Sequence, residues 1–135
     1  MKESLNKSQI ERFSRQLVLK NIGAKGQKKI LSSKILIVGV GGLGCPAAEN
    51  LVRAGIGTIG LVDNDIINLS NIHRQSLFTS KDIKKSKVSV AAKKLREINP
   101  STKFTLAPKA THSILLANGA SLGINTLASM LALAA

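Results

Sequence analysis

The sequence predicts an α/β fold in which a doubly wound parallel sheet, incomplete in this chain, follows an N-terminal helix. Two continuous apolar runs, at 35–38 and 58–62, have the composition of strands buried in a parallel sheet. A glycine-rich turn and an apolar-periodic segment separate the two runs, as in a βαβ unit. With 135 residues, of which 44% are hydrophobic, the chain has the size and apolar content of one domain.

Helix signals precede the first strand. Ser8 and Glu11 have the spacing of a capping box, so we expect a helix to begin at this point. Apolar side chains then recur at helical spacing as far as Leu17. Gly23 and Gly26 are expected to end the helical pattern.

The first strand, at 35–38, leads directly into the glycine-rich turn. Pro46 follows at a position that a first helical turn tolerates. The apolar residues after it predict a helix that stops near Gly55. A helix is therefore expected between the first two strands.

The second strand, at 58–62, is followed by a segment without strong periodicity, 64–80, which we expect to be a loop with short turns. Apolar residues share one face over about 85–97 and predict a helix. Pro100 and the asparagine before it end that helix, and 103–106 is expected to form a third strand. The alternation of strands and helices is that of a doubly wound sheet.

Charge and composition narrow the function classes. Lys and Arg number 20 against 7 Asp and Glu, which gives a net charge of +13. The lysines are spread along the chain, which favours a solvated basic surface, with a phosphate-bearing ligand as the alternative. Trp and Tyr are absent and Phe occurs three times, so no base-stacking surface for nucleic acid is expected.

The single cysteine, Cys45, excludes an intramolecular disulfide and a zinc site made of cysteines alone. It lies in the glycine-rich turn, where we expect it to be a small packing residue. The polar N-terminus lacks the apolar segment of a secretory signal. A cytoplasmic protein is therefore expected.

The glycine-rich turn carries the main functional signal. Gly39, Gly41 and Gly44 form a G-x-G-x-x-G pattern, and Asp63 stands at the end of the second predicted strand. In this setting the glycines allow a tight turn, close approach of phosphates and close helix packing, and the helix N-terminus attracts an anion. The Asp63 carboxylate can accept hydrogen bonds from ribose hydroxyls. The sequence therefore predicts a Rossmann-like nucleotide site.

The identity of the nucleotide stays open at this level, because dinucleotide enzymes and adenylating enzymes share this half of the fold. Asn71, Arg74 and Gln75 follow shortly after the second strand, and we expect them at the mouth of the site. Arg74, Lys87 and Arg15 can supply more positive charge than the two phosphates of a dinucleotide need. This favours a triphosphate.

Five motifs, in their order and spacing over about residues 8–107, resemble the ThiF/MoeB/HesA family, relatives of the ubiquitin-activating enzymes. The motifs are Arg12-Phe-Ser-Arg-Gln16, Ile35-Leu-Ile-Val-Gly-Val-Gly-Gly-Leu-Gly-Cys45, Leu61-Val-Asp-Asn-Asp65, Leu69-Ser-Asn-Ile-His-Arg-Gln75 and Lys87. The resemblance implies an enzyme that binds ATP and Mg²⁺ and adenylylates the C-terminal Gly-Gly carboxylate of a ubiquitin-like sulfur-carrier protein. It also implies a homodimer.

The resemblance assigns roles position by position. The implied nucleotide-binding residues are Gly39, Gly41, Gly42, Gly44, Asp63, Asp65, Ser70, Asn71, Arg74 and Lys87. The implied catalytic residues are Arg15, Arg74 and Lys87, and Arg15 would reach into the site of the other subunit. No metal ligand is assigned, because the segment that carries the family's Mg²⁺-holding Asp has no counterpart here. Structural zinc is not expected, because the family's paired C-x-x-C ligands are absent.

The end of the chain departs from the family pattern. Every charged side chain lies within Lys2–Lys109, and the rest is small and apolar with scattered polar residues that make a poor membrane helix. We therefore expect a truncated nucleotide-binding domain at 1–108, a tail at 109–135 that does not resemble the family, and no membrane partner. The alternative functions are an NAD- or FAD-binding oxidoreductase fragment and a non-catalytic nucleotide-binding paralogue.

Overall fold

The computed structural model describes residues 4–107. Its helices are α1 (Lys7–Arg12), α2 (Ser14–Leu17), α3 (Gly23–Ser32), α4 (Gly44–Ala54) and α5 (Lys87–Ile98), with the short 3-10 helices η1 (Leu69–Asn71) and η2 (Ser80–Asp82). Its strands are β1 (Lys34–Val38), β2 (Thr58–Val62) and β3 (Lys103–Ala107). They form an open parallel sheet in the order β1-β2-β3. The predicted α/β class with a parallel sheet is confirmed.

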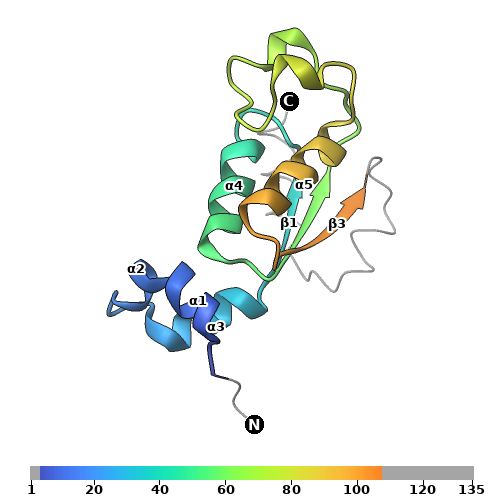
Figure 1. Ribbon diagram of the computed structural model, residues 1–135. Helices are drawn as coiled ribbons and strands as arrows, with labels where there is room; N and C mark the ends of the chain where they lie inside the picture. The colour runs from blue at the N-terminus through green and yellow to red at the C-terminus, as the bar shows by residue number, and fades with distance from the viewer. Residues whose placement is uncertain (1–3, 108–135) are drawn as a thin grey trace.

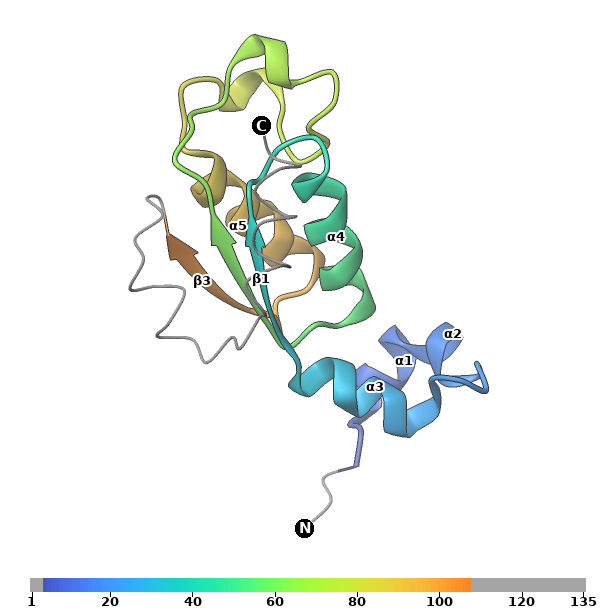
Figure 2. The ribbon, with the colours of Figure 1, turned by 180° about the vertical axis from the view of Figure 1, so that it is seen from behind.

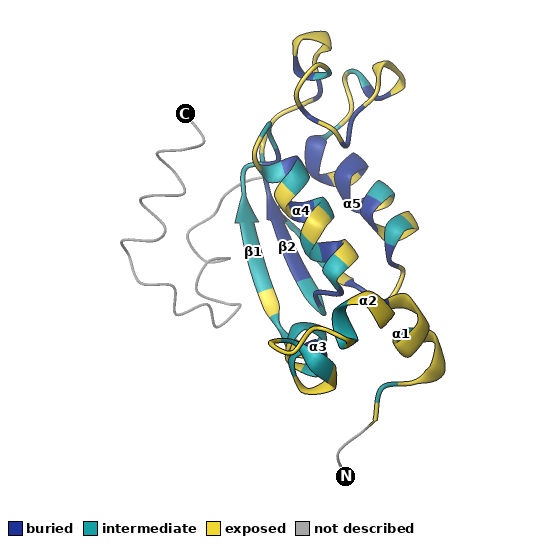
Figure 3. Cartoon of the chain, turned by 90° about the vertical axis from the view of Figure 1, so that its left-hand side faces the viewer, coloured by how far each residue is buried: buried dark blue, intermediate teal, exposed yellow. Residues whose placement is uncertain are grey.

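Helices α4 and α5 cover one face of the sheet (Figure 1). Because side chains alternate along a strand, every second residue points toward these helices. Ile59 and Leu61 of the central strand β2 are fully buried, whereas Ile37 of β1 is only partly buried. Val52 of α4 and Leu95 of α5 belong to the same core. Figure 3 shows the buried residues along β2 and along α5.

The connections divide between the two ends of the sheet, which Figures 1 and 2 show from opposite sides. Helices α1, α2 and α3 lie at the amino end of the strands. The glycine-rich turn 39–44 and the long connection 63–86 lie at the carboxyl end. Ligands of open α/β sheets bind outside the carboxyl ends of the strands. The fold therefore places the glycine-rich turn where such a ligand belongs.

The N-terminal region differs from its prediction. The capping box is made by Asn6 and Gln9, two residues before the expected pair, with hydrogen bonds of 2.9 and 3.0 Å between side chain and backbone. Asparagine caps a helix as well as serine does, so the same spacing two residues earlier is satisfied instead. The helix breaks at Phe13, whose ring is buried against Gly55. The break turns the chain so that this ring reaches the core.

The prediction that Gly23 and Gly26 end the helical pattern is wrong, because α3 begins at Gly23 and contains Gly26. Tertiary contacts outweigh the low helix propensity of these two glycines. A Cβ on Gly26 would stand 3.2 Å from the Ile22 side chain, so the small residue allows a close turn. The buried Gln27 then donates a hydrogen bond of 2.9 Å to the carbonyl of Ala54.

The remaining elements match the sequence expectations closely. The three strands lie where they were predicted, and α4 ends at Ala54, just before Gly55, which has a φ of 95°. The two short 3-10 helices fall in the segment expected to be a loop, and α5 covers most of its predicted range. The expected tail at 109–135 lies outside the described residues. Among residues 4–107, no helix is long and apolar enough to cross a membrane.

Candidate functional site

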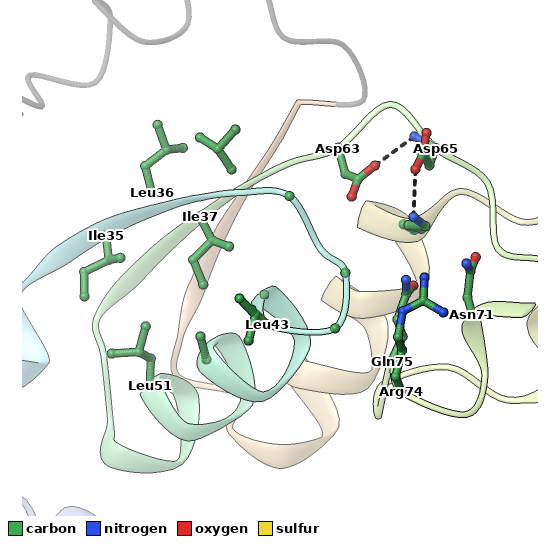
Figure 4. Close-up of a pocket in the computed structure, with 17 residues that line it drawn as sticks. Ile35, Leu36, Ile37, Leu43, Leu51, Asp63, Asp65, Asn71, Arg74 and Gln75 are labelled. Atoms are coloured by element: carbon green, nitrogen blue, oxygen red, sulfur yellow. Dashed lines mark hydrogen bonds and ion pairs between the residues drawn. The ribbon is translucent and has the colours of Figure 1, made fainter. Parts of the chain in front are cut away.

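A cleft of about 840 Å³ opens at the carboxyl ends of β1 and β2 (Figure 4). Its apolar wall comes from β1 and from Leu43 and Leu51. Its polar wall is made by residues from the glycine-rich turn, the end of β2, the following connection and the start of α5: Gly39, Gly41, Gly42, Gly44, Asp63, Asp65, Asn71, Arg74, Gln75 and Lys87. The fold thus brings together nine of the residues assigned to nucleotide binding, from four separate segments.

The glycines of the turn have two different surroundings. A Cβ on Gly44 would collide with the carbonyl oxygen of Gly39, so the fold itself requires a glycine at the start of α4. A Cβ on Gly41 would stand 3.7 Å from the nearest atom, Nε2 of Gln75, which is ordinary contact. The fold leaves room for a methyl group at Gly41.

Asp63 links the glycine-rich turn to the end of β2. One carboxylate oxygen accepts the backbone N–H of Val40 at 2.7 Å, and the other accepts the backbone N–H of Asp65 at 2.9 Å. A carboxylate oxygen has two lone pairs, so each of these oxygens can accept one more hydrogen bond. Asp63 therefore fixes the turn and still presents acceptors to the cleft.

Lys87, the first residue of α5, carries its ammonium group into the cleft. The residue is 5% exposed, and its Nζ lies 2.8 Å from Oδ2 of Asp65. The backbone N–H of Lys87 also donates to the Asp65 carbonyl, at 3.2 Å. Lys87 is thus a buried cation fixed to one residue by both its backbone and its side chain.

The short helix η1 positions the next pair of side chains. Oδ1 of Asn71 accepts the backbone N–H of Asn68 at 2.9 Å, which leaves the amide N–H groups of Asn71 as donors at the cleft. The Arg74 guanidinium donates to the Ser70 carbonyl at 2.8 Å, and the alkyl part of Arg74 lies alongside Gly42. Both side chains therefore present hydrogen-bond donors at the cleft, and Arg74 adds a positive charge.

Two of the predicted residues do not line the cleft. Ser70 contributes its carbonyl to the orientation of Arg74, and its side chain is outside the lining. Arg15 is exposed on α2, at the amino end of the sheet and therefore at the opposite end from the cleft (Figure 1). Within this chain, Arg15 does not reach the site.

Gln75, which the sequence places at the mouth of the site without a binding role, belongs to the lining of the cleft. This residue is 3% exposed, lines the cleft, and has an Oε1 atom without a hydrogen-bond partner among the described residues. Its position directly after Arg74 was a signal, but a glutamine side chain gives no chemical hint of its role until its burial is known. A buried amide oxygen without a partner costs about 1–3 kcal/mol, so a bound group that donates to it would be stabilised.

Cys45 lies behind the glycine-rich turn and takes no part in this polar wall. It is fully buried, and its thiol lies 3.6 Å from the carbonyl oxygen of Val40. Burial raises the pKa of the Cys45 thiol to about 11, so the thiol stays protonated at neutral pH. A protonated buried thiol is a poor nucleophile, which agrees with a packing role.

Comparison with known proteins gives the same assignment as the motifs. The model of the ThiF family matches residues 13–123. Adenylyltransferase and sulfurtransferase uba4 of Aspergillus niger is 48% identical over 108 residues, which cover 76% of this chain and 22% of that protein. The sulfur carrier protein ThiS adenylyltransferase of Escherichia coli is 46% identical over 101 residues, which cover 75% of this chain and 40% of that protein. The chain thus spans between a fifth and two fifths of these relatives.

The fold comparison agrees. A crystal structure of the E. coli tRNA N6-threonylcarbamoyladenosine dehydratase, TcdA, in complex with ATP has a TM-score of 0.76 and 30% sequence identity. The match covers 90% of this chain and 49% of that chain. Sequence motifs, the cleft at the carboxyl end of the sheet and these relatives lead to one conclusion: the chain belongs to the ThiF family.

Proposed function

We propose that the cleft binds ATP and that the chain is the nucleotide-binding part of an adenylyltransferase acting on a ubiquitin-like sulfur-carrier protein. The arrangement of Arg74, Lys87 and Asn71 opposite the glycine-rich turn carries this proposal. Two cations and an amide beside a helix N-terminus suit the high negative charge of a triphosphate. Asp63, with free lone pairs on both oxygens, suits the ribose hydroxyls.

The relatives support the choice of chemistry. Both curated relatives are named adenylyltransferases, and one name specifies a sulfur-carrier protein as the substrate. The structural neighbour TcdA binds ATP. An activated carboxylate on a carrier protein is therefore the product class that this family membership favours.

The reaction requires charge neutralisation and little proton transfer. An oxygen of the carrier's C-terminal carboxylate attacks the α-phosphorus of ATP, the bond from this phosphorus to the bridging oxygen breaks, and pyrophosphate leaves with the electron pair. The nucleophile is already ionised at neutral pH, so no general base is needed. The barrier comes from bringing two anions together, and Arg74 and Lys87 lower it by stabilising the charge on the phosphates.

Mg²⁺ does not fit the described part of the cleft as a complete site. Asp63 and Asp65 are the carboxylates in its lining, and their oxygens accept hydrogen bonds from backbone N–H groups or pair with Lys87. Among residues 4–107, no group of three or more His, Cys, Asp or Glu side chains is placed to hold a metal ion.

Arg15 enters the proposal through a second copy of the chain. It lies at the end of the sheet opposite the cleft, so it can contact phosphates only in another subunit. A homodimer in which Arg15 of one copy reaches the cleft of the other fits both this placement and the role that the family resemblance implies.

Titration calorimetry with ATP and with NAD tests the nucleotide assignment. We expect ATP to bind more tightly than NAD. Arg74→Ala should weaken ATP binding by roughly tenfold or more, because a charge-assisted hydrogen bond contributes about 1.5–3 kcal/mol. Arg53→Ala is the matched control, because Arg53 is exposed on α4, pairs with Glu49 and does not line the cleft.

Tighter binding of NAD than of ATP, unchanged by Arg74→Ala, would instead support the oxidoreductase alternative. Exchange of labelled pyrophosphate into ATP in the presence of a Gly-Gly-ended carrier separates an enzyme from a binding protein. Carrier-dependent exchange supports adenylylation. ATP binding without any exchange supports the non-catalytic paralogue.

A further inference from the structure

The two partners of the ion pair between Lys87 and Asp65 differ strongly in their exposure to solvent. The Lys87 side chain is 7% exposed, whereas the Asp65 side chain is 62% exposed. A buried ammonium without a counter-charge is strongly unfavourable, and Asp65 supplies that charge at 2.8 Å. The solvent-exposed carboxylate of Asp65 thus pairs with a buried cation of the cleft, and this pairing neutralises the positive charge of Lys87.

Asp63 and Asp65 therefore have different tasks, although they stand two residues apart. Asp63 holds backbone N–H groups with both oxygens, so its place is fixed by the turn and by β2. The Asp65 backbone is also fixed, by its N–H to Asp63 and by its carbonyl to the Lys87 N–H. The Asp65 carboxylate, in contrast, is held by the Lys87 ammonium and is otherwise open to solvent. It can leave that contact without disturbing the backbone.

We propose that Asp65 is a positioning residue that holds the Lys87 ammonium at the cleft through their ion pair and yields it to the phosphates of a nucleotide. A free inorganic anion has to displace Asp65 without the hydrogen bonds that a ribose would make with Asp63. A nucleotide displaces Asp65 while also gaining these hydrogen bonds, so the ion pair opposes the binding of a free anion more than that of a nucleotide. Asp65 thus selects against free inorganic anions. This inference rests on the proposed function, because it takes a phosphate chain as the ligand.

Asp65→Asn tests the proposal with two probes, inorganic pyrophosphate and adenosine. The variant keeps the shape of the side chain and removes its charge, so Lys87 no longer has to leave an ion pair. We expect pyrophosphate to bind about three- to tenfold more tightly than in the unchanged chain. Adenosine binding should not change, because Asp65 would not contact the nucleoside. Asp65→Glu should restore the weak pyrophosphate binding.

Two controls separate this role from simpler ones. Glu49→Gln also removes a carboxylate, but one that pairs with Arg53 outside the cleft, and it should leave pyrophosphate binding unchanged. In a Lys87→Met background, Asp65→Asn should have no effect. If Asp65→Asn tightened pyrophosphate binding equally in that background, the proposal would be overturned. The effect would then come from the loss of a negative charge near the cleft and not from the release of Lys87. Weaker adenosine binding would also overturn it, by making Asp65 a direct nucleoside ligand.

Nuclear magnetic resonance on the unchanged 135-residue chain covers the case in which Asp65→Asn fails to fold. Addition of pyrophosphate should shift the Lys87 ammonium and Asp65 carboxylate signals together. A shift of Lys87 without Asp65, or no shift of either at saturating pyrophosphate, contradicts the exchange. The ATP titration separates the two proposals, since a chain that binds pyrophosphate as expected and rejects ATP keeps the ion-pair exchange and loses the nucleotide assignment.

Discussion

At the scale of single residues, Gly41 and Gly44 of the same turn differ in the space that the fold leaves for a side chain. The Cβ of Gly44→Ala would collide with the Gly39 carbonyl, and neither backbone segment can move cheaply. This variant should lose about 1–3 kcal/mol of unfolding free energy through overpacking. Gly41→Ala meets no such obstacle and should unfold within about 1 kcal/mol of the unchanged chain. Its methyl group would instead hold phosphates away from the backbone and weaken ATP binding at least tenfold, or about 1.4 kcal/mol.

Urea unfolding and ATP titration of both variants check this division. Gly44→Ala should lose mainly free energy of unfolding, whereas Gly41→Ala should lose mainly affinity for ATP. If Gly41→Ala bound ATP as tightly as the unchanged chain, the phosphates would not approach the turn at this glycine. Each variant serves as the control for the other, because both add one methyl group to the same turn.

At the scale of structural elements, Asp82 fastens the connection between β2 and α5. It is 8% exposed, accepts hydrogen bonds from the backbone and the hydroxyl of Thr79, and pairs with Lys94 of α5 at 2.6 Å. The hydrogen bond from Lys94 is the main reason that the pKa of Asp82 lies well below its ordinary value. This contact holds the loop that carries Asn71 and Arg74 against the helix that carries Lys87.

Asp82→Asn should therefore destabilise the chain in a pH-dependent way. Because the folded pKa lies below the unfolded value near 3.9, the contribution is fully present above about pH 5 and is lost as the pH falls through the folded pKa. At pH 7 we expect a loss of roughly 1.5–3 kcal/mol in the free energy of unfolding. The difference between the variant and the unchanged chain should shrink steadily below pH 4.

Urea titrations at pH 7 and at pH 2.5 measure this dependence. Glu49→Gln is the control, because its more exposed pair with Arg53 spans one turn of α4 and contributes less than about 1 kcal/mol. An Asp82→Asn deficit of equal size at both pH values would show that the side chain acts through its shape and not through its charge.

At the scale of the whole molecule, the sheet separates the cleft from Arg15. The cleft lies at the carboxyl ends of the strands, and Arg15 lies with α1–α3 at the amino ends. A contribution of Arg15 to ATP binding therefore requires association of two copies. ATP affinity should rise with protein concentration through the range in which dimers form, by roughly tenfold for one charge-assisted contact.

Calorimetry at several protein concentrations, with sedimentation velocity to measure the dimer, checks this expectation. Arg15→Ala should abolish the rise in affinity. Lys20→Ala, which removes another exposed positive charge from the same end of the chain, should keep it. An affinity that stays constant while dimers form would remove Arg15 from the site.

Local sequence signals correctly predicted the elements whose formation depends on residues that lie close together in the chain. The strands and α5 lie close to their predicted bounds, because buried apolar runs and a single helical face leave few alternatives. The N-terminal region failed for the opposite reason. Whether Phe13 breaks a helix and whether Gly23 begins one depends on the contacts of Phe13 with Gly55 and of Gln27 with Ala54, which lie far apart in the sequence.

The sequence by itself determined the fold class, the family and most residues of the cleft, because glycine spacing and the ends of parallel strands constrain where phosphate-binding groups meet. Only the tertiary structure decided how those residues are buried and paired. It alone shows that Lys87 is neutralised by Asp65, that Gln75 is buried with an unpartnered oxygen, and that Arg15 lies at the far end of the sheet. Burial and pairing depend on contacts between distant segments, and residue spacing does not encode them.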